Sequence, residues 1–101
     1  MEKFQNLIQA EKPVLVDFSA EWCAPCKMLH PILKQVKDSL GDQVKIVKID
    51  VDQNRELAMQ YRIQSVPTLM LFQKGEMKWK GMGVMQAKQL ESTILSNVEP
   101  S

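Results

Sequence analysis

The hydrophobic positions of the chain change spacing several times, and each change marks a predicted element. Apolar residues recur at helical spacing within residues 1–10, which predicts a short amphipathic helix that Pro13 closes. Residues 14–18 form an apolar run rich in β-branched and aromatic side chains, which favours a buried strand. From 29 to 40 the spacing i, i+3, i+4, i+7 predicts a long amphipathic helix that ends at Gly41.

Pro31 lies inside this long helical pattern. A proline removes one backbone donor and crowds the preceding turn of a helix. Because the apolar stripe continues beyond Pro31, we expect a bend near His30 rather than a break.

The middle of the chain repeats the alternation of strand and helix. Residues 44–49 predict a second strand, and 53–62 predict a helix. Either Asp50 or Asp52 is placed to cap the start of that helix, since a carboxylate accepts from its free backbone N–H groups.

The last third of the chain predicts a hairpin and a closing helix. Residues 68–72 and 77–80 predict two strands joined by a turn at Gly75, and the second alternates so that one face is wet. Residues 87–98 predict an amphipathic helix, followed by a frayed tail at 99–101. The seven methionines adjoin apolar segments, so we interpret them as core filling.

Size and charge indicate a single globular domain over residues 1–101. A hydrophobic content of 45% suffices for one core. Thirteen Lys and Arg nearly balance twelve Asp and Glu, which argues against partners such as nucleic acid or an anionic membrane surface. The chain starts without a long apolar segment or a small-residue cleavage site, and this predicts a cytoplasmic protein.

Cys23 and Cys26 are the only cysteines, and they follow the first predicted strand directly. In the first turn of a helix this spacing places the two Cα atoms roughly 5 Å apart, within the range of a disulfide. Such a pair in a reducing compartment is more often catalytic or metal-binding than structural. A zinc half-site with His30 is the alternative, but the outer two residues would be separated by about 10 Å of helical rise, so we predict no metal.

Several signatures follow one another along the chain in a fixed order, with the cysteine pair at the first strand-to-helix junction. They are Asp17, Phe18, Ala20, Trp22, Cys23, Cys26, Pro31, Val66, Pro67, Thr68, Gly75 and Gly83. In these residues and in its order of elements, the chain resembles the thioredoxin family over essentially its whole length. The family implies an α/β fold with a mixed central sheet flanked by helices. Only 16 residues precede Asp17, so the family's frequent N-terminal edge strand is expected to be missing and the sheet to have about four strands.

Two residues depart from the family pattern, and one position points to a reductant. Ala24 stands where the family usually has glycine, and Ser19 stands where many members have a second tryptophan. Pro25 occupies the second position between the cysteines, as in reducing members of the family.

The chemistry expected of the pair is thiol–disulfide exchange. A thiolate is the attacking species, and the positive end of a helix favours the anion of Cys23, a direction that the family also implies. Cys23 is therefore the predicted nucleophile, and Cys26 resolves the mixed disulfide.

Asp17 is the one acid in an apolar strand, and burial would raise its pKa toward neutrality. The family implies that it takes the proton of Cys26. An exposed acid at a strand end is the alternative. Lys48 shares parity with the apolar positions of the second strand and is predicted to tune Asp17, although a lysine that reaches solvent is equally compatible.

Val66 and Pro67 form the family's cis-proline loop by resemblance, whereas a trans proline would merely mark a strand start. In the cis form, Val66 offers backbone groups to an extended substrate. Trp22, Ala24 and Pro25 complete the predicted apolar docking surface, unless Trp22 belongs to the core.

The resemblance thus implies a monomeric protein-disulfide reductase without a bound cofactor. Electrons would come from NADPH through a flavin-dependent thioredoxin reductase, and client proteins with disulfides would be the substrates. Two alternatives stay open: an oxidant or isomerase with the same chemistry, and a binding module whose cysteines are incidental.

Overall fold

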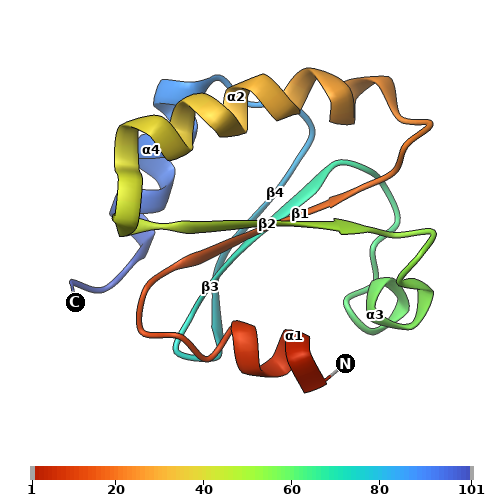
Figure 1. Cartoon of the computed structure of the whole chain (residues 1–101), viewed down its shortest axis with the longest axis horizontal. Coiled ribbons are helices and arrows are strands. Elements are labelled where there is room, and N and C mark those ends of the chain that lie inside the picture. The colour runs from red at the N-terminus through yellow and green to blue at the C-terminus, as the bar shows by residue number, and fades with distance from the viewer. Residues whose placement is uncertain (1, 101) are drawn as a thin grey trace.

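Four strands form one sheet with helices on both of its faces (Figure 1). The computed structural model describes residues 2–100, so Met1 and Ser101, the ends of the predicted domain and tail, lie outside the described residues. The elements are α1 (Glu2–Leu7), β1 (Val14–Ser19), α2 (Ala24–Leu40), the 3-10 turn η1 (Gly41–Gln43), β2 (Lys45–Asp50), α3 (Arg55–Gln60), β3 (Thr68–Gln73), β4 (Glu76–Met82) and α4 (Ala87–Asn97). This order confirms the predicted α/β fold.

The sheet is mixed and runs in the order β2-β1-β3-β4. β1 pairs in parallel with β2 and antiparallel with β3, and β3 pairs antiparallel with β4. All six residues of β1 and of β3 are buried, because these two strands lie in the middle of the sheet. The site-bearing end of β1 is therefore held on both sides by neighbouring strands.

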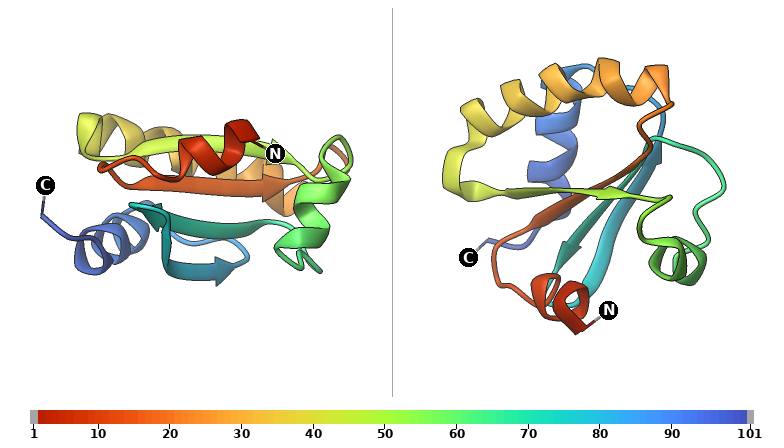
Figure 2. Two further views of the ribbon diagram at one scale, coloured as in Figure 1. Left: turned by 90° about the horizontal axis from the view of Figure 1, so that it is seen from below. Right: turned by 45° about the vertical axis from the view of Figure 1, so that its right-hand side comes forward.

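Each face of the sheet carries its own hydrophobic core. Figure 2 shows α2 and α1 on opposite sides of the sheet. Along β1, Leu15 points to the face covered by α2 and α4, whereas Val14, Val16 and Phe18 point to the face covered by α1. The second core is rich in aromatic rings at edge-to-face or tilted angles, with centroids 5.4 to 6.4 Å apart. Its rings come from Phe4, Phe18, Tyr61 and Phe72.

α2 runs without a break through Pro31, as expected from its continuous apolar stripe. The buried residues of the helix recur every three or four positions, so a single face packs on the sheet. That face comprises Cys26, Leu29, Leu33, Val36 and Leu40. The bend expected near His30 stays a prediction.

The predicted cap of the third helix is wrong. α3 is shorter than the predicted 53–62, and Asn54 stands at its N-cap without a side-chain hydrogen bond to the helix. The Asp50 carboxylate instead accepts from the backbone N–H groups of Asp52 and Gln53, at 2.8 and 3.2 Å. Asp50 thus stabilises the loop ahead of α3, because its carboxylate binds the backbone N–H groups two and three residues further on.

The clean alternation predicted for the fourth strand is also wrong. A β-bulge shifts the pairing so that Leu71 faces Trp79 and Phe72 faces Met77, which leaves Lys78 as an extra residue. Lys78 is half-buried, and its Nζ lies 3.0 Å from a carboxylate oxygen of Glu99. The turn before β4 matches expectation, since Lys74 and Gly75 both have positive φ angles.

Most methionines do not fill the core as predicted. Met70 is buried, but four others expose between 46% and 77% of their surface. These four are Met28, Met59, Met77 and Met82. The periodicity of the sequence does not distinguish these positions, because a flexible methionine side chain fits an exposed edge of the core as well as its centre.

Gln73 ties both ends of the chain to the sheet, and its loss should lower stability. Its buried amide donates to the carbonyl oxygens of Glu11 and Glu99 and accepts from the N–H of Glu99, at 2.8 to 3.0 Å. In Gln73→Ala these groups lose their partner, so we expect the free energy of unfolding to fall by about 2 kcal/mol in urea denaturation. Gln60→Ala, at an exposed helical position, is the control and should change it little. Equal stability of both variants would contradict this role.

Candidate active site

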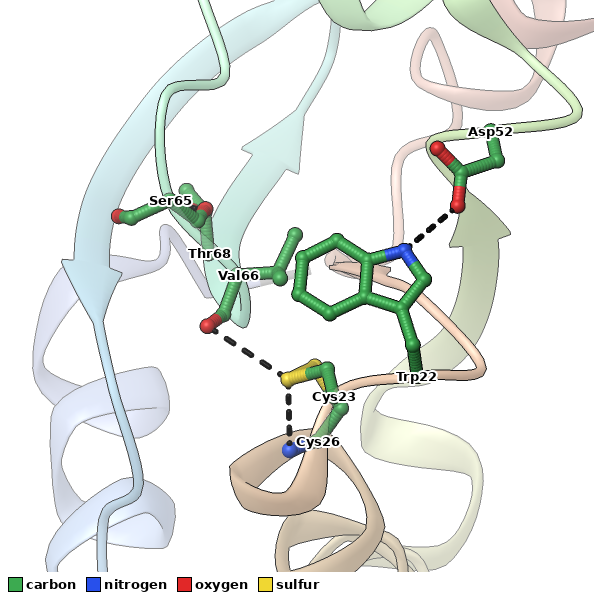
Figure 3. Close-up of a disulfide and its surroundings, with 7 residues drawn as sticks. All are labelled: Trp22, Cys23, Cys26, Asp52, Ser65, Val66 and Thr68. Carbon is green, nitrogen blue, oxygen red and sulfur yellow. Dashed lines mark hydrogen bonds between the residues drawn. A yellow bond between two sulfur atoms is a disulfide. The ribbon is translucent and has the colours of Figure 1, made fainter.

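The start of α2 is built around the sulfur of Cys23. Cys23 is the N-cap residue, with extended backbone angles, and its Sγ accepts a hydrogen bond of 3.1 Å from the backbone N–H of Cys26 (Figure 3). A disulfide joins the two cysteines, whose Cα atoms lie 5.3 Å apart. The spacing expected from helical geometry is therefore confirmed, and the sulfur sits where the helix offers unpaired donors.

Both cysteines are more buried than a position at a helix start suggests. Cys23 exposes 3% of its surface and Cys26 exposes 1%, and both pack with Ala20 against Val51 and Val66. The two residues between them, 24 and 25, are exposed and form the outer surface of the turn. Both cysteines of the disulfide are therefore buried.

The segment before β3 reaches the disulfide from the opposite side. The Val66–Pro67 peptide bond is cis, so the alternative of a trans proline is wrong. The carbonyl oxygen of Val66 lies 3.6 Å from Sγ of Cys23 (Figure 3). The hydroxyl of Thr68 donates to the carbonyl oxygen of Ser65 at 2.7 Å and closes this loop. Residues 43 positions apart in sequence therefore meet at the sulfur.

Trp22 lies at the rim of the site and not in the core. Its side chain is exposed, with 71% of its surface open to solvent. The indole Nε1 donates to a carboxylate oxygen of Asp52 at 2.8 Å, and this bond fixes the ring beside the disulfide (Figure 3). The sequence gives no signal for Asp52 as the partner, because the two residues are joined only through the fold.

Asp17 is fully buried, which excludes the alternative of an exposed strand end. Neither of its carboxylate oxygens has a hydrogen-bond partner among the described residues. Burial raises the pKa of Asp17 from 3.8 to about 6, and the positive charge of Lys48 partly offsets this rise. The carboxyl group therefore titrates close to neutral pH.

Lys48 lies directly opposite Asp17 in the parallel pairing of β1 and β2. It is exposed, so its ammonium group reaches solvent while its charge still acts on the buried carboxylate. His30 is exposed on α2, and its pKa is lowered, first by desolvation and then by the charge of Lys48. The same lysine thus influences two titratable groups on this side of the sheet.

Ser19 is a polar member of the site that the sequence marks only as a departure from a family pattern. Its side chain is buried, and its hydroxyl has no partner in the described part of the chain. Alternation along β1 directs it to the same face as Asp17, two residues away. Two buried side chains without a hydrogen-bond partner among the described residues, Asp17 and Ser19, therefore lie on the same face of β1.

A hollow of about 650 Å³ lies between α1 and the start of α3, and its lining includes Asp52 but neither cysteine. Within residues 2–100, no cluster of three or more His, Cys, Asp or Glu side chains is arranged to hold a metal ion. In the same range, no helix has the length and apolar character needed to span a bilayer.

A disulfide at the first turn of a helix, beside a cis-proline loop on a mixed sheet, defines the class of the thiol–disulfide oxidoreductases. Comparison with known proteins identifies one family within this class. The sequence matches the thioredoxin family over residues 1–96. A thioredoxin from Rickettsia bellii is 42% identical over 94 residues, which cover 93% of this chain and 90% of the relative.

Two further similarities agree with the family match. A thioredoxin-like protein from Synechocystis is 52% identical over 86 residues, covering 85% of this chain and 82% of that protein. A solved mutant thioredoxin from Halobacterium salinarum has a TM-score of 0.87 and 34% identity, and covers 100% of this chain and 88% of that one.

The chain belongs to the thioredoxin family and is a protein-disulfide oxidoreductase. Members of this family work without a bound cofactor, because the reacting groups are the two cysteines themselves. Disulfide substrates and reductase partners follow from this membership.

The buried carboxylate makes stability depend on pH. The native state keeps the proton of Asp17 between pH 3.8 and about 6, where the unfolded state has released it. The free energy of unfolding therefore falls as pH rises through this window, by about 3 kcal/mol in total. Asp17→Asn lacks this titration, so its stability relative to wild type should rise with pH through this window and stay level above about pH 6.

Urea unfolding at pH 3.5, 5 and 7.5 measures this difference. Asp38→Asn, an exposed position on α2, is the matched control and should show no growing advantage. A constant difference between Asp17→Asn and wild type at all three pH values would contradict the raised pKa.

Proposed function

We propose that this protein reduces disulfides in client proteins, with Cys23 as the nucleophile and Cys26 as the resolving thiol. The observation that carries the proposal is the hydrogen bond of 3.1 Å from the Cys26 N–H to Sγ of Cys23. When the disulfide is reduced, the same donor and the start of α2 favour a thiolate on Cys23 over a neutral thiol.

The reaction has two exchange steps. The Cys23 thiolate attacks one sulfur of the client disulfide, a mixed disulfide forms, and the other client sulfur leaves as a thiolate. Cys26 then loses its proton and attacks Cys23, which closes the Cys23–Cys26 disulfide and releases the reduced client. The Cα separation of 5.3 Å supports the second step, since the closed bond needs little movement of the backbone.

Asp17 is proposed as the base that takes the proton of Cys26 in the second step. Its pKa of about 6 supports this role, because such a carboxylate accepts and returns a proton near neutral pH. Lys48 is proposed to tune Asp17 from the neighbouring strand, as its charge favours the ionised carboxylate.

Trp22, Ala24, Pro25, Val66 and Pro67 are proposed to dock the client. The exposure of residues 22, 24 and 25 and the position of the Val66 carbonyl beside Cys23 support this surface. An extended segment of the client would pair with backbone groups of Val66. Binding would therefore depend little on the amino-acid sequence of the client.

The proposal also covers the oligomeric state, the location and the electron supply of the protein. The protein acts as a single-domain monomer in the cytoplasm, without metal or a bound cofactor. A flavin-dependent thioredoxin reductase recharges it with electrons from NADPH. The family match to bacterial thioredoxins supports these points in general terms.

Substitution of each cysteine separates the two thiol roles. With dithiothreitol as reductant, wild type should accelerate the reduction of insulin disulfides, and Cys23→Ser should fall to the uncatalysed rate. Cys26→Ser keeps the nucleophile and should trap a mixed disulfide with the client, which is detected by non-reducing mass spectrometry.

Three outcomes would contradict this assignment. Wild type that leaves insulin unreduced favours a binding module, and a mixed disulfide on Cys23→Ser reverses the thiol roles. A reduction potential of the Cys23–Cys26 couple well above that of the glutathione pool favours an oxidant or isomerase.

Removal of the Lys48 charge should raise the pKa of Asp17 further, because the one cause that lowers this pKa is lost. In Lys48→Met, the carboxyl carbon of Asp17 should titrate at higher pH by NMR. The pH profile of the resolving step should move in the same direction. Lys45→Met removes a charge from the opposite face of β2 and is the control. Equal shifts in both variants would show a general charge effect and contradict the tuning role.

A further inference from the structure

Met82 lies beside the site, although neither the cysteine motif nor the docking residues include it. It is the last residue of β4 and faces Thr68, the first residue of β3. The backbone N–H of Gly83 donates to the carbonyl oxygen of Pro67 at 3.0 Å, which extends this pairing to the cis-proline loop. Met82 is therefore held against the segment that reaches the disulfide.

The Met82 residue is exposed, and its sulfur accepts a hydrogen bond. The residue exposes 66% of its surface, and the hydroxyl of Ser65 donates to its Sδ at 3.5 Å. Ser65 precedes Val66, whose carbonyl oxygen lies 3.6 Å from Sγ of Cys23. In Figure 3 the Ser65 and Trp22 side chains lie on opposite sides of Val66. Met82 thus borders the cis-proline loop that reaches the disulfide.

We propose that Met82 is a redox-modification site, at which oxidation of the thioether to the sulfoxide weakens the docking of client proteins. The inference rests on the proposed reductase function, since it assigns a role to the rim of that site. The oxidant is a peroxide, such as hydrogen peroxide.

The chemistry is a two-electron transfer of oxygen. The Met82 sulfur attacks one oxygen of the peroxide, an S–O bond forms and the O–O bond breaks. The proton on the transferred oxygen passes to the departing hydroxide, which leaves as water. The thioether is oxidised and the peroxide is reduced. In the disulfide form of the protein both cysteines are already paired, so exposed thioethers are the sulfur groups that remain open to peroxide.

Oxidation changes the rim from apolar to polar. A thioether contributes apolar contact area to a client, whereas a sulfoxide carries a strong dipole that must be desolvated on docking. The hydroxyl of Ser65 already donates to this sulfur, and the sulfoxide oxygen is a stronger acceptor for the same donor. This hydrogen bond would hold the polar sulfoxide next to the cis-proline loop.

The test uses the full chain in its disulfide form, treated with hydrogen peroxide and then freed of peroxide with catalase. Peptide mass spectrometry measures the sulfoxide at each methionine, and insulin reduction with dithiothreitol gives KM and kcat. We expect the KM for insulin to rise about fivefold, equivalent to about 1 kcal/mol, with kcat changed much less. Treatment with methionine sulfoxide reductases should restore the original KM.

Two variants locate the effect, each compared with its own untreated sample. Met82→Leu cannot form the sulfoxide, so its KM should be the same before and after peroxide. Met77→Leu removes an exposed methionine from the other end of β4 and should remain as sensitive as wild type.

The two proposals fail in different ways. Untreated wild type that leaves insulin unreduced would overturn the reductase function. Untreated protein that is active, with a KM that stays constant after complete oxidation of Met82, would overturn the modification site alone. Equal sensitivity of Met82→Leu and wild type, or oxidation of the other exposed methionines that spares Met82, would also overturn it.

Discussion

The hydrogen bond from the Cys26 N–H to Sγ of Cys23 is the contact on which the site depends. An N-cap side chain normally supplies an oxygen to the free donors of a helix, and here a sulfur takes that place. The same contact sets the start of α2, where the two Cα atoms lie 5.3 Å apart, and directs the positive end of backbone dipoles at this sulfur. One interaction thus joins the start of the helix to the electrostatic environment of the disulfide.

β1 supports this contact at a cost to stability. The strand is buried on both faces, and alternation directs Asp17 and Ser19 to the side that α2 covers. Neither side chain has a partner among the described residues, and an uncompensated buried polar group lowers stability. The raised pKa of Asp17 is a consequence of the same burial. Central strands with purely apolar side chains would be more stable and would lack that group.

Segments far apart in sequence complete the surface around the sulfur. The loop before β3 brings the Val66 carbonyl to Cys23, and the loop after β2 supplies the carboxylate that holds Trp22. The end of β4 adds Met82 through its pairing with β3. These contacts are made possible by the sheet order β2-β1-β3-β4, which places β1 and β3 side by side at its centre. The surface around the sulfur is consequently assembled from several loop ends.

The sequence by itself determined the order of elements and the disulfide spacing, because apolar periodicity and helical geometry act over a few residues. The four-stranded mixed sheet followed only from the resemblance to the thioredoxin family. Tertiary structure alone decided that Asp17 is buried, that Trp22 bonds to Asp52, and that both sulfurs are shielded. It also decided the bulge at Lys78, the uncapped start of α3 and the exposure of Met82. Burial and partner choice depend on which distant segments pack together, and no local pattern encodes that pairing.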